Sequence, residues 1–148
     1  MPVLPALYPL HPRLVHFPIA LSLVGSACIL WGMWRGREQW TVYGRTSLLF
    51  GWIGALIAAL TGLVDQSRAP DDPAVSAAIN RHITAGIAVI VVLGLAVYWP
   101  LRERRLLAQP GHRWAYIGLI LAGAALVVLE AWLGGQLVYH LGVGVIGR

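Results

Sequence analysis

Four long apolar runs constrain this chain more than any other feature, because each is long enough to cross a lipid bilayer. They cover residues 14–34, 47–64, 83–99 and 114–139. A bilayer core of about 30 Å requires roughly 20 mainly apolar residues per helix. Lipid offers the backbone no hydrogen-bond partners, so helices are the expected form of these runs. The sequence therefore predicts one all-α domain over residues 1–148, an up-and-down bundle of four transmembrane helices in contact with lipid.

The composition agrees with a membrane protein. Hydrophobic residues make up 58% of the chain and charged residues 11%, against about 25% charged residues in soluble domains. The net charge of +5 comes from arginine, because the chain has no lysine. Such an excess can indicate nucleic-acid binding in a soluble protein. Here the arginines lie between apolar runs, so we expect them to set membrane topology and predict no nucleic-acid partner. The single cysteine, Cys28, excludes an intrachain disulfide.

The arginines also predict the orientation of the bundle. The loops after the first and third runs carry Arg35, Arg37, Arg45, Arg102, Arg104, Arg105 and Arg113. The opposite face carries Arg13, Arg68, Arg81 and Arg148. Cytoplasmic loops are enriched in arginine, so we expect the first and third loops in the cytoplasm and both termini outside.

Ionisable residues gather at the outer face of this predicted bundle. His16 opens the first helix, Asp65 closes the second, His82 opens the third, and His140 closes the fourth, with His11 just outside. Residues at these helix ends can simply face water and lipid headgroups. They can also form a hydrogen-bonded network. A third interpretation is that they bind a metal or cofactor.

The cofactor interpretation favours haem. The first and third helices of an up-and-down bundle are diagonal neighbours, so His16 and His82 could ligate a haem from its two sides, with Asp65 as acceptor for a ring N–H. His140 and His11 are the alternative haem ligands. The chain lacks Cys-x-x-Cys-His, which predicts b-type haem rather than covalent attachment. A zinc or copper site built from His16 and His82, with His11 and His140, is chemically possible too.

Glu130 is the one acidic residue deep in a predicted span. It lies ten residues before His140, hence about 15 Å deeper along the helix. A charged carboxyl is costly at that depth. Glu130 is therefore either a proton-handling catalytic residue or a neutral side chain hydrogen-bonded to another helix.

A weak internal repeat relates the two halves of the chain. Ala59-Leu-Thr-Gly-Leu-Val-Asp65 resembles Trp132-Leu-Gly-Gly-Gln-Leu-Val-Tyr139, and each follows a helix opened by histidine. Two related hairpins would make His16 and His82 equivalent.

Several motifs resemble one known family. They are His11-Pro-Arg-Leu-Val-His-Phe-Pro-Ile-Ala20, Thr61-Gly-Leu-Val-Asp65, the helix start at His82, and Gly134-Gly-Gln-Leu-Val-Tyr-His-Leu-Gly-Val-Gly-Val145. Together they look like the bacterial membrane family called domain of unknown function 2231. That resemblance implies a small four-helix protein of a bacterial membrane. Together with the arginine distribution, it leads us to expect an inner-membrane protein with both termini periplasmic. Some relatives carry the domain fused to Rieske or c-type cytochrome domains, which implies a redox setting for them.

Two functional hypotheses follow. In the first, this membrane protein binds b-type haem and passes electrons between quinol and a separate periplasmic cytochrome c or Rieske protein. In the second it is a non-redox membrane protein, either a histidine-cluster metal-binding module or a structural subunit of a larger membrane complex. No serine or cysteine lies beside a base near the polar layer, so nothing predicts a hydrolase.

Overall fold

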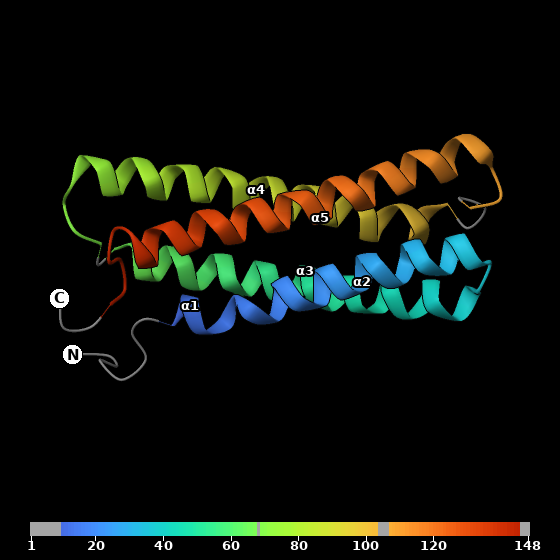
Figure 1. The fold of residues 1–148 in the computed structure, drawn as a ribbon, viewed down its shortest axis with the longest axis horizontal. Helices are drawn as coiled ribbons and strands as arrows, with labels where there is room; N and C mark the ends of the chain where they lie inside the picture. Colours follow the sequence, from blue (N-terminus) through green and yellow to red (C-terminus); the bar gives the residue numbers. More distant parts are fainter. Residues whose placement is uncertain (1–9, 68, 104–106, 146–148) are drawn as a thin grey trace.

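The computed structural model describes residues 10–67, 69–103 and 107–145. Its helices are α1 (His11–Leu14), α2 (His16–Arg35), α3 (Glu38–Gln66), α4 (Pro73–Arg102) and α5 (Pro110–Tyr139). The described residues contain no strand. Four long helices lie side by side and alternate in direction, and the start of α1 and the end of α5 share one end of the bundle (Figure 1). Each long helix contains one predicted apolar run, which confirms the all-α four-helix prediction.

The first span is almost continuous from α1 into α2. Pro12 occupies the first turn of α1, where its missing N–H had no partner to lose. The helix is interrupted at Val15, just where Pro18 has no N–H to donate to the Leu14 carbonyl. Helical hydrogen bonding resumes at Ile19, whose backbone N–H donates to the Val15 carbonyl oxygen at 3.2 Å. Helical structure therefore begins at His11, earlier than the apolar run alone indicates.

The helix α4 also begins before its apolar run. The Asp72 Oδ1 atom accepts from the backbone N–H of Ala74 at 2.7 Å and of Val75 at 3.3 Å. Pro73 follows this N-cap in the first turn, the position that proline tolerates best in a helix. His82 therefore does not open the helix as predicted. It lies nine residues after Pro73, about 13 Å along the helix axis.

Glycines hold α2 and α3 together. A Cβ atom on Gly25 would lie 2.8 Å from the Gly44 carbonyl oxygen, and one on Gly44 would lie 2.6 Å from the Gly25 carbonyl oxygen. Close backbone approach of this kind is how helices associate in lipid, where packing replaces the hydrophobic effect. The first hairpin is therefore the most tightly packed pair of the bundle.

The bundle has a hydrophobic core and an apolar surface. Ile29, Leu48, Leu93, Tyr116 and Ile120 are almost fully buried and come from α2, α3, α4 and α5. Many other large apolar side chains are exposed on the outside of the same helices. All four long helices are long and apolar enough to cross a membrane, so their exposed side chains face lipid. Neighbour contacts join α2 to α3 and α5, and α4 to α3 and α5, which leaves α2 diagonal to α4.

Candidate functional site

One ionisable side chain from each quarter of the bundle reaches a common cluster. His11 comes from α1, Asp65 from the end of α3, His82 from α4 and Glu130 from α5. We call these four residues the polar cluster. The cluster lies toward the end of the bundle where α1 begins, because His11 opens α1 and Asp65 lies one residue before the end of α3.

His11 is held by two hydrogen bonds to α3. Its backbone N–H donates to the Asp65 Oδ2 atom at 2.9 Å. Its ring Nδ1 atom lies 2.7 Å from the carbonyl oxygen of Ala58. A carbonyl oxygen can only accept, so Nδ1 carries the proton of this bond. In the neutral imidazole the lone pair is therefore on Nε2, which makes no hydrogen bond to the described residues.

His82 is held from α5 in a similar way. Its Nε2 atom lies 3.4 Å from the Glu130 Oε1 atom, and the two side chains are 15% and 18% exposed. With Glu130 ionised, its carboxylate can only accept, and the ring proton of this contact is then on Nε2. The Nδ1 atom is buried and has no hydrogen-bond partner among the described residues. A buried polar atom in that state is unusual and calls for a ligand or water.

The two imidazoles meet across the diagonal of the bundle. The ring centroids of His11 and His82 are 5.8 Å apart, with an angle of 78° between the ring planes. Each ring has one nitrogen facing a protein acceptor and one nitrogen without a protein partner. The cluster therefore brings two imidazoles, one from each half of the chain, into contact.

The other predicted site residues lie outside this arrangement. His16 is exposed and makes no polar contact with the cluster. His140 is exposed at the C-cap of α5. Asp65 was expected to support a ring N–H, but it accepts from the backbone of His11 instead. Within the described ranges, no group of three or more His, Cys, Asp or Glu side chains is placed to hold a metal ion.

Sequence reasoning missed the groups that orient the histidines. The acceptor for His11 is the main-chain carbonyl of Ala58, and a backbone acceptor leaves no signal in the sequence. The sequence identifies Glu130 as unusual, but it predicts its partner His82 at the first residue of the third helix. The sequence does contain a signal for the true start of α4. Asp72 precedes Pro73, and an aspartate followed by proline is a pattern that starts helices.

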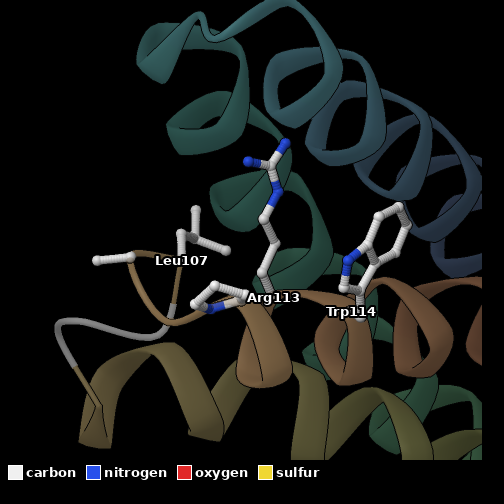
Figure 2. Close-up of a pocket in the computed structure, with 5 residues that line it drawn as sticks. Leu107, Arg113 and Trp114 are labelled. Atoms are coloured by element: carbon white, nitrogen blue, oxygen red, sulfur yellow. The ribbon is translucent and has the colours of Figure 1, made fainter.

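A separate cavity lies at the opposite end of the bundle. It has a volume of about 320 Å³ and is lined by Leu107, Ala108, Pro110, Arg113 and Trp114. Figure 2 shows Arg113 extended away from the start of α5 toward the neighbouring helices. Its Nη2 atom donates to the Met33 carbonyl oxygen at 2.9 Å. Arg113 therefore joins α5 to the end of α2 and has no contact with the polar cluster.

The fold and the cluster define a four-helix membrane protein with ionisable side chains gathered toward one end of the bundle. The chain belongs to the family described as predicted membrane protein, domain of unknown function 2231 (DUF2231), whose model matches residues 7–147. This match confirms the family resemblance read from the motifs. No curated protein and no solved structure matches the chain.

Proposed function

We propose that this membrane protein is a redox protein that holds a b-type haem with His11 and His82 as axial ligands. The observation that carries the proposal is the arrangement of the two rings. They come from diagonal helices, each is oriented by a protein acceptor, and each keeps one nitrogen without a protein partner. The sequence favours His16 and His82 as the haem ligands and offers His11 as an alternative. The contact between the His11 and His82 rings favours His11 in place of His16.

The acceptors match what metal-bound histidines require. A ligating histidine nearly always donates its other ring N–H to a carbonyl or carboxylate, which sets the tautomer and the ring orientation. Ala58 supplies the carbonyl for His11 and Glu130 the carboxylate for His82. Two axial imidazoles complete the coordination of haem iron, whereas structural zinc takes four ligands. His11 would bind haem through Nε2, the nitrogen that histidine ligands of haem use. His82 would offer the same atom only by giving up its contact with Glu130, because an Nδ1 ligand would bring its own Cβ against the porphyrin. Zinc or copper, which binds either ring nitrogen, remains the alternative.

The rest of the functional hypothesis follows from the position of the cluster. A bound haem would supply one-electron chemistry near the outer membrane surface. We propose that electrons pass there between a quinol in the lipid and a separate periplasmic cytochrome c or Rieske protein. The role of Glu130 as a proton carrier stays a prediction, and the described contact supports its role as the acceptor for His82.

An absorption spectrum tests the haem proposal directly. The protein is produced with haem supplied, purified in mild detergent and checked for helical content by circular dichroism. We expect a Soret band and the visible bands of low-spin iron with two histidine ligands. A folded protein without a Soret band would overturn the proposal, and metal analysis of the same sample would then test the zinc or copper alternative.

The orientation provides a second prediction. We propose an inner-membrane location with both termini periplasmic. Cytoplasmic loops are enriched in arginine, and the arginine-rich loops lie at the end of the bundle away from the polar cluster. Alkaline phosphatase, which folds in the periplasm, should be active when fused to the C-terminus and inactive when inserted at Gly36 between α2 and α3. The reversed pattern would place the polar cluster on the cytoplasmic side.

A further inference from the structure

We propose that Gly62 and Gly134 are positioning residues that set the places of the two imidazole rings. A Cβ atom on Gly62 would lie 3.1 Å from the His11 Nδ1 atom and 3.2 Å from Cε1. A Cβ atom on Gly134 would lie 3.2 Å from the His82 Cε1 atom. Each ring therefore lies so close to helix backbone that an added Cβ atom would require it to shift by a few tenths of an ångström. The consequence for cofactor binding rests on the proposed function, whereas the contacts themselves do not.

The two halves of the chain build these contacts in the same way. His11 and Gly62 belong to the hairpin of α1, α2 and α3, and His82 and Gly134 belong to the hairpin of α4 and α5. In each hairpin the first helix supplies the histidine and the second supplies the glycine. The separations are nearly equal, 62 − 11 = 51 residues and 134 − 82 = 52 residues. The structure therefore pairs His11, and not His16, with His82 as the equivalent residues of the repeat.

The rings cannot move freely away from an added methyl group. For His11 the nearest atom is Nδ1, the same atom that donates to the Ala58 carbonyl at 2.7 Å. For His82 the nearest atom is Cε1, which lies between the two ring nitrogens, so a shift changes the direction of both. A displacement of a few tenths of an ångström would weaken the oriented hydrogen bonds and redirect the free nitrogens.

The cluster contains its own matched controls. A Cβ atom on Gly86 of α4 would lie 3.8 Å from the Glu130 Oε1 atom, an ordinary contact distance. A Cβ atom on Gly135 would lie 3.9 Å from the Tyr139 side chain. Gly86 faces the cluster and Gly135 is next to Gly134 in the sequence, but alanine fits at both.

The test compares four alanine variants of the full-length protein: Gly62→Ala, Gly134→Ala, Gly86→Ala and Gly135→Ala. Histidine ¹⁵N NMR shifts are measured without haem. We expect Gly62→Ala to move the His11 signals and Gly134→Ala to move the His82 signals, with little change in the controls. Where haem is bound, the first two variants should weaken its binding about 10- to 100-fold, as outer-shell changes do.

A double-mutant cycle separates positioning from general packing. Thermal unfolding is measured for Gly134→Ala alone, His82→Ala alone and the combined variant, and likewise for Gly62 with His11. We expect the fall in Tm caused by each glycine variant to disappear when the facing ring is removed. An equal fall in both backgrounds, or unchanged ring signals, would overturn the proposal. These readouts need no haem, so a haem-free wild type would refute the proposed function and still decide this inference.

Discussion

Replacing His82 with alanine is expected to remove the haem spectrum, and replacing His11 is expected to do the same. Each substitution deletes one of the two imidazoles that face each other across the bundle at 5.8 Å. A haem iron left with one protein ligand loses its low-spin spectrum, and haem is then lost easily on purification. The measurement is the ratio of the Soret band to the protein band after purification, together with the position of the visible bands.

His16 and His140 supply the controls for this experiment. Both are exposed, so His16→Ala and His140→Ala should keep the wild-type spectrum and haem content. Loss of the spectrum in His16→Ala would restore the ligand pair expected from sequence. Survival of the spectrum in the combined His11→Ala and His82→Ala variant would show that neither is an axial ligand.

Gly44→Ala is expected to lower the stability of the bundle strongly. The added Cβ atom would lie 2.6 Å from the Gly25 carbonyl oxygen and 2.6 Å from the Ile29 backbone nitrogen. Backbone atoms of two packed helices cannot yield to a methyl group unless α2 and α3 move apart. Overpacking of this kind costs about 1–3 kcal/mol in the free energy of unfolding. Gly25→Ala should have a similar cost, because it meets the same helix pair from the other side.

Gly118→Ala is the matched control for this prediction. It lies in α5, and a Cβ atom there would meet nothing within 4 Å. Alanine is also a better helix former than glycine by about 1 kcal/mol, so this variant should be as stable as the wild type or more so. Unfolding followed by circular dichroism in mild detergent with added denaturing detergent measures all three variants. Equal stability of Gly44→Ala and Gly118→Ala would contradict the packing argument.

The general position of the polar cluster could be expected from sequence, but its members could not all be identified. His11 and His16 are five residues apart, which is about 140° around a helix. Once α1 begins at His11 and the His11 ring faces α3, His16 must point elsewhere, and it is exposed. The apolar pattern placed the helix start too late, because Pro12 and Arg13 interrupt hydrophobicity without interrupting the helix.

The contact between His82 and Glu130 depends on how far each residue lies along the axis of the bundle. Glu130 was expected well below the histidine layer, because His82 was placed at the opening of its helix. The Asp72 cap starts α4 earlier, so His82 is already inside the bundle and meets Glu130 at 3.4 Å. Apolar composition indicates where lipid begins, whereas a helix can continue beyond the lipid.

The sequence by itself determined the class of this protein, the four membrane helices, their alternating course and the shared end to which the ionisable residues come. These properties depend on local composition, because lipid requires about 20 apolar residues with internally paired backbone groups in each crossing. Only the tertiary structure decided that His11 faces His82 and that Gly62 and Gly134 lie against their rings. Those contacts depend on the rotation and height of each helix. Both are set by backbone packing such as that of Gly25 against Gly44, between residues far apart in the chain.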